Sequence, residues 1–177
     1  VPHINEALLD VLNDGQCADG ELYTHGWDFQ KIVSAIKKTN ENTPDIQYHI
    51  YDLPDMTDRS KPFVKRYSSF ERQAITNAPA CLVAVETPLI RTEEALMAYE
   101  DKCHNDGYEG IMARNVQSQY LFGYRSKDLL KVKRFLDDEY EIVDFTHGTS
   151  IELECIVFVC KTKNDHTFSV RPVGTHE

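Results

Sequence analysis

The chain has 177 residues, of which 41% are hydrophobic and 27% are charged, a composition typical of globular proteins and not of disordered or fibrous ones. The 29 acidic residues outnumber the 19 lysines and arginines, and the net charge of −10 argues against binding nucleic acid over the whole surface, though not at a local basic patch. No apolar run approaches the roughly 18 residues that a membrane-spanning helix needs, and residues 1–12 lack the pattern of a secretory signal. We therefore expect an intracellular protein without a membrane partner.

Five cysteines, at positions 17, 81, 103, 155 and 160, form no Cys-x-x-Cys pair and no regular framework. We expect them to be isolated thiols in a reducing compartment, and not disulfides or zinc ligands. The chain begins at Val1 without an initiator methionine and stops just after a strand-like segment. We expect it to be a fragment, or the ordered part, of a longer protein.

Helix-like and strand-like patterns follow one another along the first part of the chain. Apolar residues at helical spacing predict a helix over residues 4–12, and alternation then predicts a strand over 18–23. A second helix is predicted over 29–36, followed by a strand over 46–53. The next helical pattern predicts a long helix over 62–76.

The middle of the chain continues the same mixture. A short apolar run predicts a strand over residues 81–86. The next helix should begin at Thr92, an N-cap followed by two acidic residues, and end near Gly107. Alternation predicts two further strands, over residues 109–114 and 130–133.

The pattern changes after Phe135, where helical spacing disappears. Three strands are predicted in succession, over residues 140–145, 156–162 and 167–172, with turn signals between them. We therefore expect a second, small all-β unit that begins near residue 136. Because strands and helices do not alternate strictly before it, the predicted fold class is α+β and not a doubly wound parallel sheet.

Two glutamates stand in predicted strands directly beside a glycine, at Asp19-Gly20-Glu21 and Glu109-Gly110. A glycine in a strand lets a ligand or another backbone approach closely. Carboxylates at such places suit a hard cation such as Mg²⁺, which uses one or two protein carboxylates together with substrate phosphates and water. The alternative is that each glutamate is a solvated charge at a strand edge.

Positive charge is concentrated in two segments of this acidic chain. Residues 59–72 and 125–135 each hold five basic residues against one acidic residue, which suits contact with a phosphate backbone or an ordinary solvated face. In the second segment, Lys131 and Lys133 share one strand face. Their ammonium groups repel unless an anion lies between them, and a polyphosphate is a natural one. Ordinary solvated lysines are the alternative.

Four segments resemble, in sequence and in order, the nucleotidyltransferase motifs III, IIIa, IV and V of ATP-dependent DNA ligases: Asp19-Gly20-Glu21-Leu22, Tyr51-Asp52-Leu53, Glu109-Gly110-Ile111-Met112-Ala113-Arg114 and Leu130-Lys131-Val132-Lys133. Residues 138–143 resemble the beginning of that family's OB domain. The resemblance implies that residues 1–135 are the C-terminal part of an α+β nucleotidyltransferase (ATP-grasp-like) adenylation domain, with antiparallel sheets and flanking helices. Residues 136–177 would begin an OB-type β-barrel.

The resemblance also implies a role for each matching residue. Glu21 would contact the ribose or help to hold the metal, and Glu109 would be the principal metal carboxylate. Tyr51 would stack on the adenine ring, where the alternative is a half-buried strand tyrosine. Lys131 and Lys133 would hold the α-phosphate of ATP and neutralise charge during phosphoryl transfer.

One departure from the family pattern concerns the nucleophile. Family members form a lysyl-adenylate on a Lys-x-Asp-Gly motif upstream of motif III. The Asp-Gly pairs of this chain begin at positions 14, 19 and 106, and the residues two before each aspartate are Leu12, Cys17 and His104. We therefore expect the 177 residues alone to be inactive, because no lysine stands where the covalent intermediate forms.

The function implied by the resemblance is the sealing of nicks in duplex DNA through enzyme–AMP and DNA–adenylate intermediates. ATP and Mg²⁺ (or Mn²⁺) would be the cofactors, and Arg114 would make a DNA or structural contact. We expect a compact, monomeric enzyme of viral or phage type. It would act in the cytoplasm, the nucleus or a virus-infected host cell, and would not be secreted.

Two other interpretations remain open at this point. An RNA ligase or a capping-type guanylyltransferase would share the fold and most of the motifs. A non-catalytic module that binds nucleotide or nucleic acid would account for the missing lysine. Nick-sealing assays on DNA and RNA duplexes separate the first alternative from a DNA ligase.

Overall fold

The structure is a computed structural model that describes residues 1–68, 72, 75–135, 137–148 and 155–172. The chain divides into two compact units, Val1–Arg134 and Phe135–Glu177, which are described separately below. No helix within the described ranges is long and apolar enough to cross a bilayer. The five cysteines all lie inside those ranges and none of them forms a disulfide.

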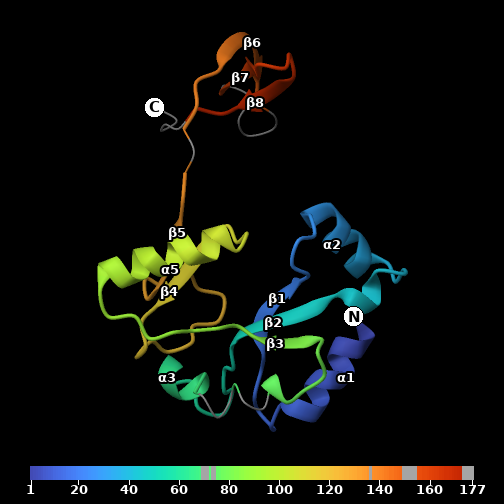
Figure 1. The fold of residues 1–177 in the computed structure, drawn as a ribbon, viewed down its shortest axis with the longest axis vertical. Coiled ribbons are helices and arrows are strands. Elements are labelled where there is room, and N and C mark those ends of the chain that lie inside the picture. Colours follow the sequence, from blue (N-terminus) through green and yellow to red (C-terminus); the bar gives the residue numbers. More distant parts are fainter. Residues whose placement is uncertain (69–71, 73–74, 136, 149–154, 173–177) are drawn as a thin grey trace. The chain divides into compact units, whose positions relative to one another are not determined.

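The first unit mixes helices and short strands, in agreement with the predicted α+β class (Figure 1). In chain order its elements are α1 (Pro2–Val11), β1 (Asp19–Tyr23), α2 (Phe29–Lys37), the 3₁₀ helix η1 (Thr43–Asp45), β2 (Gln47–Asp52), α3 (Phe63–Arg66), β3 (Leu82–Ala84), α5 (Glu93–Asn105), β4 (Gly110–Arg114) and β5 (Leu129–Lys133). Strands therefore form at all five places where the sequence predicts them in this unit.

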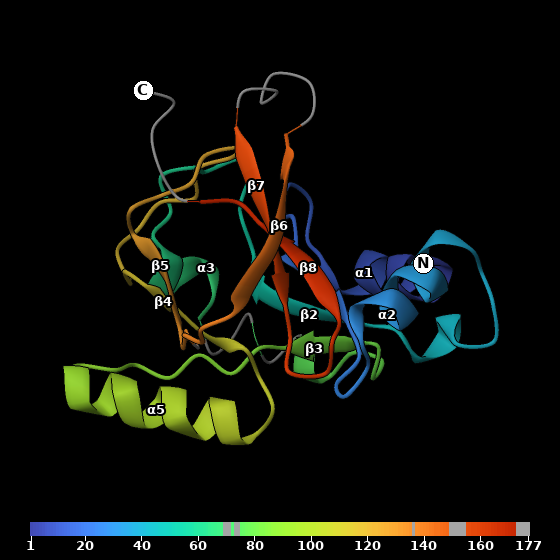
Figure 2. The same cartoon turned by 90° about the horizontal axis from the view of Figure 1, so that it is seen from above.

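The strands of the first unit form two small sheets. One has the order β1-β2-β3, in which β1 and β2 are antiparallel and β2 and β3 are parallel. The other is the antiparallel pair β4-β5. Helix α1 packs against β3 and helix α5 packs along β4, so each sheet has its own helix (Figure 1, Figure 2).

The core of the first unit lies around β2 and its neighbours. Its fully buried apolar side chains include Ala35 of α2, Ile46 and Ile50 at β2, and Ile75. Ile46 and Ile50 come from the alternation that the sequence shows, because burial of one face is what stabilises an amphipathic strand. The core thus fixes β2, the strand that carries Tyr51.

Capping residues define where two of the helices begin. The Asp28 side chain accepts a hydrogen bond from the Lys31 backbone N–H (2.8 Å) at the start of α2. The Thr92 hydroxyl accepts one from Ala95 N–H (3.2 Å) at the start of α5. Each side chain satisfies a donor that the first helical turn leaves without a partner. The predicted N-cap at Thr92 is confirmed.

The predicted helix over residues 62–76 is interrupted at Tyr67 and is not continuous, although residues 72, 75 and 76 are helical. Helix α3 ends at Arg66, and Tyr67 has a non-helical backbone with φ −121° and ψ 44°. In this conformation the Tyr67 hydroxyl donates a hydrogen bond to the Ile50 carbonyl oxygen of β2 (2.5 Å). The tertiary contact overrides the helical pattern here. Residues 69–71 and 73–74, which the same expectation covers, lie outside the described residues.

The second unit is a three-stranded antiparallel sheet of order β6-β7-β8. Its strands are β6 (Glu141–His147), β7 (Ile156–Lys161) and β8 (Thr167–Val170), close to the three strands that the sequence predicts. Val157 and Cys160 of β7 are its buried apolar residues within the described ranges. The turn between β7 and β8 has Asp165 in the left-handed region, with φ 59°.

Candidate functional site

The β4-β5 hairpin brings three of the predicted site residues together. Gly110 pairs with Lys133 and Met112 pairs with Lys131, so both lysines project from one face of the hairpin. Glu109 directly precedes β4, and its Oε1 atom accepts hydrogen bonds from Lys131 Nζ (3.1 Å) and Lys133 Nζ (3.2 Å). We call Glu109, Lys131 and Lys133 the acid–lysine cluster.

The acid–lysine cluster is an exposed group with an excess of one positive charge. Hydrogen bonds from Lys131 and then Lys133 lower the pKa of Glu109 below its usual value, so this carboxyl is ionised at neutral pH. The Glu109 side chain is 67% exposed and that of Lys131 is 49% exposed, so all three groups are accessible to a ligand. Two ammonium groups against one carboxylate can accept a further anion, such as a phosphate.

The glycines beside the two glutamates have a structural explanation. A Cβ atom on Gly110 would lie 2.3 Å from the Val132 carbonyl oxygen, and one on Gly20 would lie 2.4 Å from the His49 carbonyl oxygen. In both cases the neighbouring strand backbone needs the space, which is the second of the two reasons that the sequence suggests for a strand glycine. These glycines are therefore explained by the close approach of the neighbouring strand, and they are not evidence for a ligand.

Glu21 and Tyr51 lie on the other antiparallel pair, β1-β2. Glu21 is exposed and pairs across the sheet with His49. Tyr51 is half-buried, its hydroxyl lies 3.5 Å from the Gly20 carbonyl oxygen, and burial raises its pKa to about 12. The phenol is therefore neutral at physiological pH. Glu21 does not take part in the acid–lysine cluster.

Contacts at both ends link the two strand pairs. At one end Asp52, the last residue of β2, forms an ion pair with Arg114, the last residue of β4. At the other end the rings of His25, just after β1, and Tyr108, just before Glu109, lie 5.0 Å apart. Glu21 and the acid–lysine cluster are thus carried by strand pairs that are joined at each end.

A cavity of about 690 Å³ lies between Tyr51 and β4. Its wall includes Tyr51 and residues 111–114 of β4, and its other lining residues come mainly from α3, from α5 and from the segment that precedes α5. Apolar and aromatic side chains with a few charged groups are typical of a pocket for a small molecule. Neither Glu21 nor the acid–lysine cluster lines this cavity.

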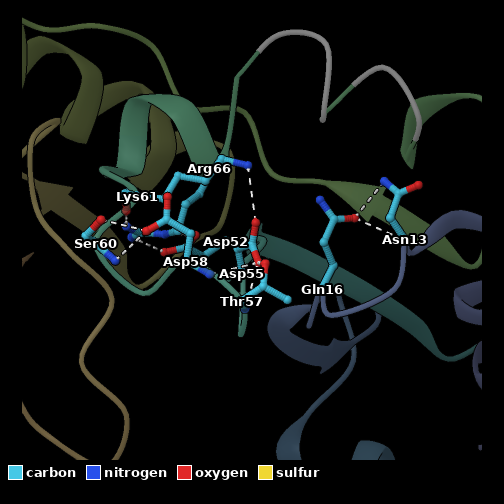
Figure 3. A network of polar contacts seen from close by, with 9 residues as sticks. All are labelled: Asn13, Gln16, Asp52, Asp55, Thr57, Asp58, Ser60, Lys61 and Arg66. Carbon is cyan, nitrogen blue, oxygen red and sulfur yellow. Dashed lines mark hydrogen bonds and ion pairs between the residues drawn. The ribbon is translucent and has the colours of Figure 1, made fainter.

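The charged residue that the sequence analysis missed is Arg66. Its guanidinium is 2% exposed and donates to both carboxylate oxygens of Asp52, with Nε–Oδ1 at 2.9 Å and Nη2–Oδ2 at 2.8 Å (Figure 3). Its Nη1 atom donates to the carbonyl oxygens of Lys61 (2.6 Å) and Ser118 (2.9 Å). The sequence shows Arg66 only as part of a basic segment, and the side chain is buried instead of solvated.

Arg114 makes the structural contact that was one of its two expected roles. Besides its ion pair with Asp52, its guanidinium lies over the Phe63 ring, 4.6 Å from the ring centre. The side chain is 13% exposed. A signal for this role was present in the sequence, since Asp52 stands between Ile50-Tyr51 and Leu53-Pro54 at the end of a predicted strand, and a buried carboxylate needs a cation.

The donor set for a metal consists of carboxylates alone. Within the described ranges, no group of three or more His, Cys, Asp and Glu side chains is placed to hold a cation. Glu21 and Glu109 are exposed carboxylates on joined strand pairs. One or two such oxygens, completed by substrate phosphates and water, fit Mg²⁺ and do not suit a metal that the protein encloses by itself.

Most of the sequence matches one known protein family. Residues 1–133 match the family described as the ATP dependent DNA ligase domain. Two similar curated proteins are DNA ligases from isolates of African swine fever virus, 29% and 28% identical over 164 residues, which is 87% of this chain and 38% of each relative. The chain therefore spans less than half the length of these relatives.

Two solved structures resemble the fold. A structure from work on Lig E DNA ligases has a TM-score of 0.75 at 20% identity, and the similarity covers 89% of this chain and 62% of that one. The adenylate of the Chlorella virus DNA ligase has a TM-score of 0.60 at 24% identity, over 96% of this chain and 67% of that one. The predicted α+β fold with antiparallel sheets agrees with both.

Proposed function

We propose, because the chain belongs to the ATP-dependent DNA ligase family, that it is part of an enzyme that seals nicks in duplex DNA with ATP. In this reaction the enzyme takes AMP from ATP, transfers it to the 5′-phosphate at the nick, and joins the ends by attack of the 3′-hydroxyl. The observation that carries the proposal is the acid–lysine cluster, in which Glu109, Lys131 and Lys133 come together as the motifs require.

Each unit has a separate part in the proposal. Residues 1–135 form the C-terminal part of the adenylation domain, and residues 136–177 begin the OB domain. The division of the chain between Arg134 and Phe135 and the all-β character of the second unit support this assignment. The partner of the complete protein is nicked duplex DNA, and the protein acts as a monomer.

The residues of the site act through charge and shape. Lys131 and Lys133 bind the α-phosphate of ATP and offset the negative charge that develops during phosphoryl transfer. Tyr51 presents a neutral aromatic ring to the adenine. Glu109 and Glu21 hold Mg²⁺ or Mn²⁺, which supplies a Lewis acid and charge shielding at the phosphates when it is bound.

The nucleophilic lysine of the reaction is proposed to lie outside these 177 residues. None of the three Asp-Gly pairs of the chain has a lysine two positions before its aspartate. The residues described here bind and orient the phosphates, and the covalent bond to AMP forms on a lysine of a Lys-x-Asp-Gly motif elsewhere in the complete protein. Activity is therefore measured on the complete protein.

A nick-sealing assay tests the proposed function. We expect the complete protein, with ATP and Mg²⁺, to seal a single nick in duplex DNA that bears a 5′-phosphate. The same nick without the 5′-phosphate is the control and should remain open. Sealing of a nicked RNA duplex but not of the DNA duplex would contradict the proposal in favour of an RNA ligase, and no sealing of either would contradict it outright.

A further inference from the structure

The inference begins with the buried ion cluster of Asp52, Arg66 and Arg114. Asp52 is fully buried, and its two carboxylate oxygens accept hydrogen bonds from Arg66 on α3 and Arg114 on β4. A charge inside a protein is costly unless it is paired and hydrogen-bonded, and here one carboxylate pairs with two guanidinium groups while backbone carbonyl oxygens accept the remaining hydrogen bonds described for Arg66. The contact joins three elements that lie far apart in the sequence.

The ion cluster stands directly beside the cavity described above. Asp52 follows Tyr51 in β2, and adjacent residues of a strand point to opposite faces. Tyr51 therefore lines the cavity from β2 while Asp52 is buried behind it, and Arg114 lines the same cavity from β4. The ion pair between Asp52 and Arg114 thus joins β2 and β4, the two strands that carry Tyr51 and Arg114 at the cavity wall.

Arg66 holds the carboxylate from a third direction. It also donates to the Lys61 carbonyl oxygen, at the end of a loop whose turns are fixed by hydrogen bonds to Asp55 and Asp58 (Figure 3). Because Asp52 accepts a bidentate pair from Arg66, its side chain has a single orientation toward Arg114. The distance between β2 and β4 is therefore set by ionic contacts of fixed geometry and not only by apolar packing.

We propose that Asp52 and Arg114 are positioning residues that fix the separation of Tyr51 from β4, and with it the affinity of the cavity for an adenine nucleotide. The inference rests on the proposed function, which places adenine against Tyr51. A planar ring stacks between Tyr51 and the opposite wall of the cavity only when the gap between them matches the thickness of the ring. Small shifts of supporting residues are known to weaken such sites strongly.

The test measures ATP affinity and folding stability separately, in the complete protein. Asp52→Asn keeps the shape of the side chain but places an amide N–H against a guanidinium. We expect it to weaken ATP binding by ~10-fold in isothermal titration calorimetry, at a temperature where circular dichroism shows the protein folded. Affinity for nicked DNA should change much less, because the cavity does not bind the duplex.

A matched control removes a buried polar contact elsewhere in the same unit. The Thr43 hydroxyl is buried and donates to the Ala35 carbonyl oxygen (2.8 Å), in a part of the core that does not line the cavity. Thr43→Val should lower Tm without changing the dissociation constant for ATP. If Asp52→Asn behaves in the same way, with lower Tm and unchanged ATP affinity, the positioning role is overturned.

A second variant covers the case in which Asp52→Asn does not fold. Arg114→Lys retains the charge but loses the planar fork, so the ion pair persists with a changed geometry. We expect a folded protein with ATP affinity reduced by about threefold to tenfold, and unchanged affinity would overturn the inference. Absence of ATP binding by the wild-type protein would instead contradict the proposed function, so the two failures are distinguishable.

Discussion

Lys131 and Lys133 meet at a single carboxylate oxygen of Glu109. The lysines lie two residues apart on β5, and without an anion between them their charges would repel. Glu109 supplies that anion, and it remains charged because the two ammonium groups lower its pKa. In the proposed function, the lysines would turn to the phosphate of a bound nucleotide and would leave the carboxylate to hold a metal. Exposed ion pairs contribute little to the free energy of unfolding. The cluster is therefore better suited to binding a ligand than to stabilising the fold.

Replacement of one lysine of the acid–lysine cluster should impair the reaction with ATP without changing the stability of the fold. We expect Lys131→Ala, made in the complete protein, to reduce formation of the enzyme–AMP intermediate by at least ~100-fold, because a charge aimed at the reacting phosphate is removed. Transfer of radioactive AMP from ATP to the protein measures the effect. Tm should be unchanged within error.

The control for that variant is a lysine of the same basic segment. Lys127 precedes β5 and is not a partner in the ion pairs that Glu109 forms with Lys131 and Lys133. Lys127→Ala removes the same charge and should leave the adenylation rate within about twofold of the wild-type rate, because an exposed charge away from the site contributes little. Equal losses in the two variants would mean that Lys131 acts only through the overall charge of the segment.

The sequence predicted the acid–lysine cluster better than it predicted the buried ion cluster of Asp52, Arg66 and Arg114. The spacing of Lys131 and Lys133 places them on one strand face whatever the rest of the fold does, because the period of a strand is two. The pairing of Asp52 with Arg66 depends on how α3 docks on β2, and no local pattern specifies that. Glu21 remains a proposed metal ligand on the strength of its motif and of the contacts that join its strand to β4.

At the scale of elements, a tyrosine adds a second contact between α3 and β2, besides the ion pair of Arg66 with Asp52. Tyr67 follows α3, is 4% exposed, and donates to the Ile50 carbonyl oxygen of β2. The same carbonyl oxygen also accepts a hydrogen bond from Val85 N–H, which follows β3. The segments that follow α3 and β3 therefore both bind the backbone oxygen of Ile50, the residue of β2 that precedes Tyr51.

Alkaline pH should break the contact between Tyr67 and β2, because the Tyr67 hydroxyl loses the proton that it donates to the Ile50 carbonyl oxygen. Burial raises the pKa of Tyr67 to about 12 from its ordinary value of 10.0. Because the folded state holds the proton more tightly than the unfolded state, this contribution to stability is complete below pH ~10 and is lost as the pH rises toward 12. We expect the urea midpoint to fall over that interval, and the difference in phenolate absorbance between the wild-type protein and Tyr67→Phe to appear at its upper end.

The comparison variant for the alkaline transition is Tyr67→Phe. It removes the titrating hydroxyl and leaves the Ile50 carbonyl oxygen with its Val85 donor, so it should cost about 1 kcal/mol at neutral pH. Between pH ~10 and 12 its urea midpoint should decline less than that of the wild-type protein. A parallel decline in both proteins would show that Tyr67 does not control the transition.

Elements were predictable where their stabilising contacts are local. The N-cap at Thr92 and the strands around residues 109–114 and 130–133 follow from capping and alternation. The helix predicted over residues 62–76 is interrupted because Tyr67 leaves the helical conformation for a contact with β2, 17 residues away in the sequence, and residues 72, 75 and 76 are helical again. Propensity cannot anticipate a partner at that distance.

At the scale of the whole molecule, the two units differ in the size of their described buried cores and in whether they carry residues of the candidate site. The first unit has a buried core around β2 and carries all the residues of the candidate site. The second unit is a three-stranded sheet with few buried apolar residues within the described ranges. Together they correspond to 38% of the length of the viral DNA ligases that they resemble.

The intact mass of the complete protein, after incubation with ATP and Mg²⁺, tests the central claim most directly. The account predicts a mass increase of one covalently bound AMP per chain, mapped by peptide digestion to a lysine outside these 177 residues. The adduct should be absent from Lys131→Ala and present in Lys127→Ala. A folded protein that acquires no AMP under these conditions, or an adduct that forms equally in both variants, would contradict the account.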